Sequence, residues 1–197
     1  MSELLLASGS HIRRLLFDHA GFAPRIEPAR IDEVLPEDTP PVVAAAALSL
    51  AKAREGAGRF PRAVVVGSDQ VMVFRGRSLS KAYTRAGARA RLTELAGRAH
   101  EFFPAAAVVA PGFEEVVAQH ARVRFRALSA AEIEAYLDTG EWQGCVGSYQ
   151  IENRGANLVE RVEGDINAVL GMPLFPLLAL LRRVGVSPLA RGARRPR

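Results

Sequence analysis

The sequence contains a single cysteine, Cys145, so it can form neither an internal disulfide nor a cysteine-rich metal site. None of its four histidines lies at metal-ligand spacing from another, which disfavours a zinc enzyme. No apolar run approaches the ~18–20 residues that span a bilayer, since the longest, Val42 to Ala51, is short and contains Ser49. Glu3 precedes only a brief apolar run, which disfavours a signal peptide. We therefore expect a cytoplasmic protein with no membrane partner.

Acidic residues are absent from the last sixteen positions, and this end of the chain explains the net charge of +5. Removing the six arginines there would leave a charge of −1 on the rest of the chain. A basic end of this kind is more often solvated than a binding arm, so we expect no nucleic-acid partner. The six are Arg182, Arg183, Arg191, Arg194, Arg195 and Arg197.

The composition, 49% hydrophobic and 24% charged over 197 residues, is that of a folded protein. No linker divides the chain, so we predict one domain over residues 1–188 and a basic tail over 189–197. Apolar periodicity and turn residues predict alternating elements, with several strands in succession, and hence an α/β fold with a mixed sheet. The predicted strands are Leu4–Ala7, Pro24–Arg30, Ala63–Val66, His100–Ala110, Val116–Arg126 and Leu158–Val159. The predicted helices are His11–His19, Pro40–Ala57, Thr84–Ala96, 129–138 and Pro173–Val184.

The segment LLLASGSHIRRLL places two serines and a glycine between a strand and a helix. A helix N-terminus attracts anions, Gly9 permits close approach of the backbone, and the flanking Ser8 and Ser10 offer hydroxyl groups. Arg13 adds a guanidinium suited to phosphate oxygens. The alternative, equally weighted on this stretch alone, is that Ser10 caps the helix and the arginines are solvated.

Charged side chains also lie in apolar or loop-like contexts. Asp69 directly follows the most buried-looking strand, where a carboxylate meets a ligand or stabilises a turn. Lys52 lies on an alanine-rich helix and Lys81 follows Leu-Ser; taken singly, each lysine is better explained as a surface side chain. Glu33 and Glu152 add carboxylates in loops. This inventory suits an oxygen-liganded Mg²⁺ or Mn²⁺ that bridges carboxylates and phosphates.

Seven segments, in this order, resemble the motifs of the Maf family of nucleoside triphosphate pyrophosphatases. They are LASGSHIRRLLFDHAG, RIDE, LAKA, VVVGSDQVMV, SLSKA, LAGRAHEFF and GCVGSYQIENRGANLVERVEGDINAVLGMPL. The resemblance runs from about Leu4 to Val186. The chain departs from the pattern at His11-Ile12, so that only Arg13 aligns with an arginine pair, at Ala82 in place of proline, and at Pro104-Ala105 in place of Thr-Gly.

The resemblance implies two lobes around a nucleotide-binding cleft, a homodimer, and hydrolysis of a nucleoside triphosphate to monophosphate and pyrophosphate. On this reading Asp69 is the general base or a metal-bridging carboxylate, and Glu33 helps to hold the metal. Lys52 and Lys81 would neutralise charge on the leaving pyrophosphate. The substrate would be bound by Ser8, Gly9, Ser10, Arg13, Gln70 and Glu152.

Glu152 and the sequence Gly-Ser-Asp-Gln are similar to the branch of the family that prefers 7-methyl-GTP. A dTTP/UTP preference is the first alternative. The second is a non-catalytic, nucleotide-binding regulator of cell division. This second alternative is favoured by the missing first arginine and by Ser80-Lys81-Ala82, where the family has Gly-Lys-Pro. The retained Asp69, Lys52, Lys81 and Glu33 disfavour it.

Overall fold

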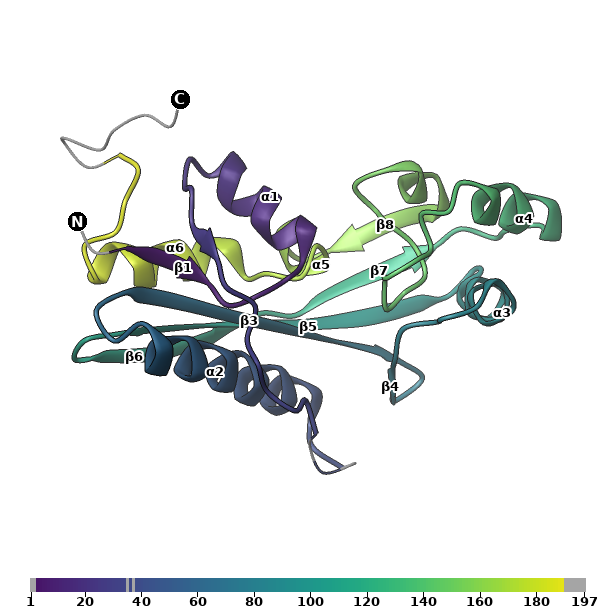
Figure 1. Cartoon of the computed structure of the whole chain (residues 1–197). Coiled ribbons are helices and arrows are strands. Elements are labelled where there is room, and N and C mark those ends of the chain that lie inside the picture. Colours follow the sequence, from purple (N-terminus) through teal and green to yellow (C-terminus); the bar gives the residue numbers. More distant parts are fainter. Residues whose placement is uncertain (1–2, 35, 37, 190–197) are drawn as a thin grey trace. The chain divides into compact units, whose positions relative to one another are not determined.

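The computed structural model describes residues 3–34, 36 and 38–189, and within them an open, mixed eight-stranded sheet flanked by helices (Figure 1). The α/β fold with a mixed sheet is thus confirmed. The strand order is β2-β1-β3-β5-β7-β8, with β4 paired to β3 and β6 paired to β5. Residues 190–197, with Arg191, Arg194, Arg195 and Arg197 of the expected tail, lie outside the described residues.

The chain divides into two compact units, each assembled from separate segments. The first comprises residues 1–70, 103–119 and 171–197, and the second comprises 71–102 and 120–170. Two long strands, β3 (Val64–Phe74) and β5 (Ala99–Ala110), contribute residues to both.

In the first unit, β1 (Leu4–Leu6) pairs in parallel with β2 (Arg25–Ile26) and with β3. Helix α2 (Pro41–Arg59) covers one face of these strands, and α1 (His11–His19) and α6 (Leu174–Arg183) cover the other (Figure 1). Val64, Val65 and Val66 of β3 are buried, at 2% exposure or less, as a strand covered on both faces requires. A hairpin joins β5 to β6 (Phe113–Ala118), which lies against α2 and α6.

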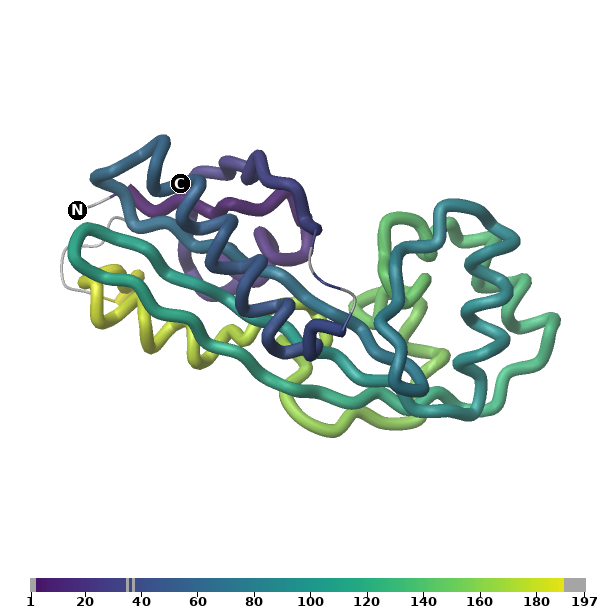
Figure 2. Tube along the Cα trace, turned by 90° about the horizontal axis from the view of Figure 1, so that it is seen from below, coloured from purple at the N-terminus to yellow at the C-terminus, as the bar shows by residue number. Residues whose placement is uncertain are grey.

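In the second unit, β3 turns back into β4 (Arg77–Leu79) through Arg75 and Gly76, whose φ angles of 51° and 75° are those of a tight hairpin turn. The start of β5 pairs with β7 (Ala121–Phe125), and β7 with β8 (Val159–Glu163). Helix α3 (Arg85–Leu95) lies beside α4 (Ala130–Asp138) (Figure 2). A 3₁₀ helix, η1 (Arg154–Leu158), and the short α5 (Ile166–Val169) complete the unit.

Several predicted elements match closely. Helix α1 has the predicted bounds, and Thr84 caps α3 by accepting a hydrogen bond from Gly87 N. The capping box that opens α4 is present, with Ser129 and Glu132 each bonded to the other's backbone.

The single strand predicted over Val116–Arg126 is wrong. It is two strands, β6 and β7, both antiparallel to β5 and separated at Gln119 and His120. The break lies opposite Pro104, which has no N–H to donate to the ladder. Leu158, also predicted as strand, ends η1 instead, and β8 begins one residue later.

Candidate active site

The expectation that Asp69 follows the end of its strand is wrong, because β3 continues through Asp69 to Phe74. The strand that ends here is β1, whose last pair with β3 is Leu6 with Val66. Beyond that pair, residues 67–70 of β3 extend past the carboxyl end of β1. This is the kind of place, at the end of a parallel strand, where α/β proteins bind ligands.

Alternation along β3 sends successive side chains to opposite faces. Gly67 faces α2 so closely that a Cβ there would lie 2.1 Å from the carbonyl oxygen of Ser49. Asp69, two residues on, points to the same face and meets Lys52 of α2. The glycine therefore lets α2 approach near enough for the lysine to reach the carboxylate.

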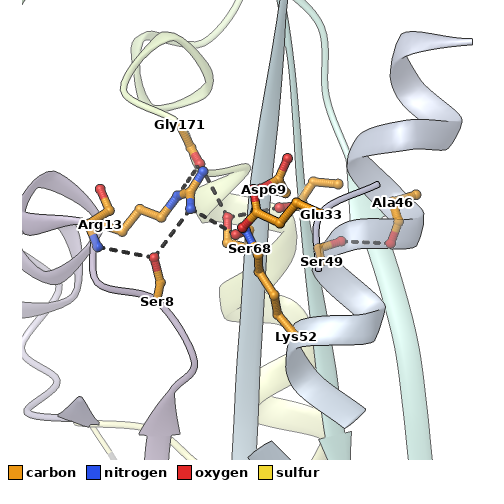
Figure 3. Close-up of polar contacts among 11 residues, drawn as sticks. Ser8, Arg13, Glu33, Ala46, Ser49, Lys52, Ser68, Asp69 and Gly171 are labelled. Carbon is orange, nitrogen blue, oxygen red and sulfur yellow. Dashed lines mark hydrogen bonds and ion pairs between the residues drawn. The ribbon is translucent and has the colours of Figure 1, made fainter. Parts of the chain in front are cut away.

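Lys52 bridges two carboxylates (Figure 3). Its Nζ lies 2.6 Å from Asp69 Oδ1 and 2.6 Å from Glu33 Oε1. The side chains of Lys52 and Asp69 are only 10% and 12% exposed, whereas that of Glu33 is 56% exposed. The interpretation of Lys52 as a surface side chain is therefore wrong. Its charge is buried and compensated, as a buried ammonium must be.

Arg13 occupies the end of β1 and holds three segments together (Figure 3). Its Nη1 donates to Ser68 O at 2.8 Å and to Ser8 Oγ at 3.3 Å, and its Nε donates to Gly171 O at 3.0 Å. Burial lowers the pKa of the Arg13 guanidinium, and the nearby Asp69 and Glu33 partly offset this. These three bonds involve Nε and Nη1 of the guanidinium.

The Ser8-Gly9-Ser10 turn is arranged around Ser8. Ser8 Oγ accepts from Ser10 N at 3.2 Å as well as from Arg13. Ser10 has N-cap backbone geometry, but its side chain makes no capping bond, and the first turn of α1 has no acidic residue. The alternative is therefore correct in making Ser10 the N-cap residue of α1, although only the backbone takes part, and it is wrong for Arg13, which is bonded to protein carbonyls rather than solvated. The N-terminus of α1 keeps its affinity for an anion.

The side chain of Gln70 lies beside Gly171 and Arg13. A Cβ added to Gly171 would lie 3.5 Å from Gln70 Oε1 and 3.6 Å from Arg13 Nε. The structure thus brings together eight of the predicted site residues, all in the first unit: Ser8, Gly9, Ser10, Arg13, Glu33, Lys52, Asp69 and Gln70.

Two residues that the sequence reasoning did not single out complete this part of the site. Ser68 is fully buried, and its Oγ donates to Ala105 O at 2.8 Å or Gly171 O at 3.2 Å. Gly171, with φ of 101°, presents its carbonyl to both Ser68 and Arg13. Their only signals in the sequence are a serine inside Gly-Ser-Asp and a glycine before Met-Pro-Leu.

Lys81 and Glu152 belong to the second unit, and both are exposed. Burial raises the pKa of the Cys145 thiol; Glu152 raises it further, and Lys81 lowers it. The charges of Lys81 and Glu152 therefore both affect Cys145, in the second unit. The raised pKa also keeps the Cys145 thiol protonated, which fits a structural residue better than a nucleophile.

The donor chemistry of the first unit suits a hard divalent cation. Asp69 and Glu33 supply carboxylates on either side of Lys52, and Mg²⁺ is commonly bound by one or two carboxylates together with substrate phosphates. Across residues 3–34, 36 and 38–189, no three His, Cys, Asp or Glu side chains group into a site built from protein ligands alone. In the same ranges no helix is long and apolar enough to cross a membrane.

Comparison with known proteins gives a consistent result. Residues 3–184 match the family model described as Maf-like protein. The chain is 43% identical to a dTTP/UTP pyrophosphatase of Moorella thermoacetica, over 94% of this chain and 97% of the relative. It is 41% identical to a nucleoside triphosphate pyrophosphatase of Nitrobacter winogradskyi (91% and 92% covered) and 37% identical to a 7-methyl-GTP pyrophosphatase of Rhizobium johnstonii (93% and 96%).

Proposed function

The chain belongs to the Maf-like protein family, and we propose that the Lys52 cluster, formed by Lys52, Asp69 and Glu33, is the centre of its catalytic site. Its relatives give the class of reaction: the chain is a nucleoside triphosphate pyrophosphatase, a hydrolase acting on acid anhydrides.

The observation that carries the proposal is the double contact of Lys52 with Asp69 and Glu33 at 2.6 Å. Lys52 contacts Oδ1 of Asp69, so we assign Oδ2 of Asp69 to the attacking water. Asp69 Oδ2 takes a proton from this water as the water oxygen attacks the α-phosphorus. A fixed carboxylate supplies both proton transfer and orientation. Lys52 thus orients the base, in addition to the charge neutralisation expected of it.

Charge balance supports a metal ion. Lys52 and Arg13 carry two positive charges and Asp69 and Glu33 two negative ones, so this group has no net charge to offset a triphosphate. We propose that Mg²⁺ or Mn²⁺ is held by Glu33 and Asp69 and, when bound, neutralises phosphate charge. Lys81 supplies a further cation for the leaving pyrophosphate.

The phosphates themselves are assigned to the turn between β1 and α1. Backbone N–H groups at the start of α1, the Ser8 and Ser10 hydroxyls and the Arg13 guanidinium are donors of the kind that bind phosphate oxygens. Arg13 serves this site in two ways, because it also holds Ser68 and Gly171 in place. The homodimer that the family resemblance implies stays a prediction, which light scattering tests.

For the base we propose 7-methyl-GTP, whose methylated ring carries a positive charge that a carboxylate and an aromatic face attract. Glu152 is exposed, and its charge reaches Tyr149: burial raises the pKa of Tyr149 well above its usual value, and Tyr136 and Glu152 add to the rise. The dTTP/UTP alternative is supported by the name of the Moorella relative.

Product analysis with 7-methyl-GTP, GTP, dTTP and UTP tests the proposal. Pyrophosphate should be released only with a divalent ion, and EDTA should stop it; steady release of orthophosphate would contradict cleavage between the α- and β-phosphates. Glu152→Gln should lower the ratio of kcat/KM for 7-methyl-GTP to kcat/KM for GTP. The control Glu160→Gln, at an exposed glutamate of β8 that pairs with Arg124, should leave this ratio unchanged. Higher kcat/KM for dTTP or UTP would overturn the base assignment. Binding without turnover would instead support the regulator of cell division.

A further inference from the structure

Arg91, on α3, connects two segments of the second unit. Its Nη1 donates to Ser80 O at 2.9 Å and also to Val146 O. Burial lowers the pKa of the Arg91 guanidinium, against a raising effect of Glu94. A half-buried arginine whose two bonds both end on backbone carbonyls fixes the course of the chain at each of them.

The first of these segments carries Lys81. Strand β4 ends at Leu79 and α3 begins at Arg85, so residues 80–84 contain neither helix nor strand. Lys81 is followed by Ala82, where a proline would have fixed the backbone φ angle. The bond from Arg91 to Ser80 holds the chain at the residue just before the lysine.

The second segment, residues 145–152, is fixed by several contacts. Tyr149 is buried, and its hydroxyl lies 2.8 Å from Nε2 of the buried His100. Gln150 N donates to the Tyr136 hydroxyl at 3.0 Å. Ser148 has a φ of 58°, a conformation that persists only where the surroundings impose it. This segment can therefore serve as a rigid support.

We propose that Arg91 is a positioning residue, which holds the Lys81 segment against the rigid segment that carries Glu152. The shared effect of Lys81 and Glu152 on Cys145 agrees with this arrangement. The inference rests on the proposed role of Lys81 at the leaving pyrophosphate, and it assigns Arg91 no contact with substrate.

A double-mutant cycle tests it. Arg91→Met removes both bonds while keeping most of the apolar stem of the side chain, and it should lower kcat/KM for the preferred triphosphate about 10- to 100-fold, as misplacement of a catalytic group does. In a Lys81→Ala background the same change should cost less than about twofold, because Arg91 acts through Lys81. Arg91→Lys, which keeps the charge and N–H donors, should recover part of the loss.

Arg89→Met is the matched control, because Arg89 lies on the same helix but pairs with Glu134 at an exposed site. It should leave kcat/KM unchanged. An equal loss from Arg91→Met with and without Lys81 would overturn the inference, as would no loss. Wild-type kcat/KM in Lys81→Ala would refute the role of Lys81 and this inference with it.

Hydrogen exchange gives a second readout that needs no turnover. The amides of residues 80–84 should exchange faster in Arg91→Met than in the wild-type protein, and at the wild-type rate in Arg89→Met. Unchanged exchange in Arg91→Met overturns the inference even if no nucleoside triphosphate is hydrolysed. Failure of the proposed function and failure of the positioning role are thereby separated.

Discussion

Replacing Lys52 with methionine removes the cation shared by Asp69 and Glu33 but keeps most of the apolar side chain. Removing one partner of a buried ion pair typically costs about 3–5 kcal/mol. Asp69 keeps slight exposure, at 12% of its side chain, which places the expected loss near the lower end, at about 3 kcal/mol. Glu33, at 56% exposure, should add less than about 1 kcal/mol.

Urea denaturation of variant and wild type measures this loss as a shift in the midpoint. Arg54→Met is the matched control, because Arg54 lies two residues further along α2 and pairs with Glu114 at an exposed site, with side chains 60% and 39% exposed. That variant should lose less than about 1 kcal/mol.

The double variant Lys52→Met/Asp69→Asn removes both buried charges together. It should be less destabilised than the two single changes summed, by about 2 kcal/mol, because neither charge is then left unpaired. Additive losses, or equal losses in Lys52→Met and Arg54→Met, would refute the reasoning that Lys52 is a buried counter-charge.

Two further predictions concern Arg13 and His100. Arg13→Ala should raise KM more than it lowers kcat. It should also lower the free energy of unfolding by about 1–3 kcal/mol, because the carbonyls of Ser68 and Gly171 lose a donor. A denaturation midpoint equal to that of the wild-type protein would contradict this. Burial lowers the pKa of His100 to about 3, so below about pH 6.5 the unfolded chain binds a proton that the folded protein does not. Stability should therefore rise with pH by up to about 1.4 kcal/mol per unit between about pH 3 and 6.5 and level off above, and a wild-type slope that persists in His100→Gln would refute the assignment.

Local chemistry accounts for the elements that were predicted well. The apolar run of β1 stops at Ser8-Gly9-Ser10, and the following helix begins directly after it. The reciprocal bonds of Ser129 and Glu132 need only residues three apart. Boundaries of this kind depend on residues that are close in the sequence, so the sequence alone predicts them.

The errors share a different cause, which is contact between distant segments. A strand end was predicted before Asp69, but β3 continues there, and Gly67 allows α2 to pass close to the strand. The interruption between β6 and β7 originates in Pro104 on the opposite strand. Lys52 can be buried because Asp69 of β3 and Glu33 of the segment before α2 both contact its ammonium group.

Residues of the candidate site could be singled out from the sequence only where their side chains are charged or hydroxylated. Ser8, Arg13, Lys52 and Asp69 carry groups whose chemistry is visible in the sequence. Gly171 acts through its backbone carbonyl, which every residue possesses and which leaves no mark in the sequence.

The most direct test of the central claim is the turnover of Asp69→Asn, a nearly isosteric change at the residue assigned to activate water. Pyrophosphate release should fall by about 10²–10⁴, while circular dichroism matches the wild-type protein and nucleoside triphosphate is still bound. A folded Asp69→Asn protein that releases pyrophosphate at the wild-type kcat would contradict the assignment of the Lys52 cluster as the catalytic centre.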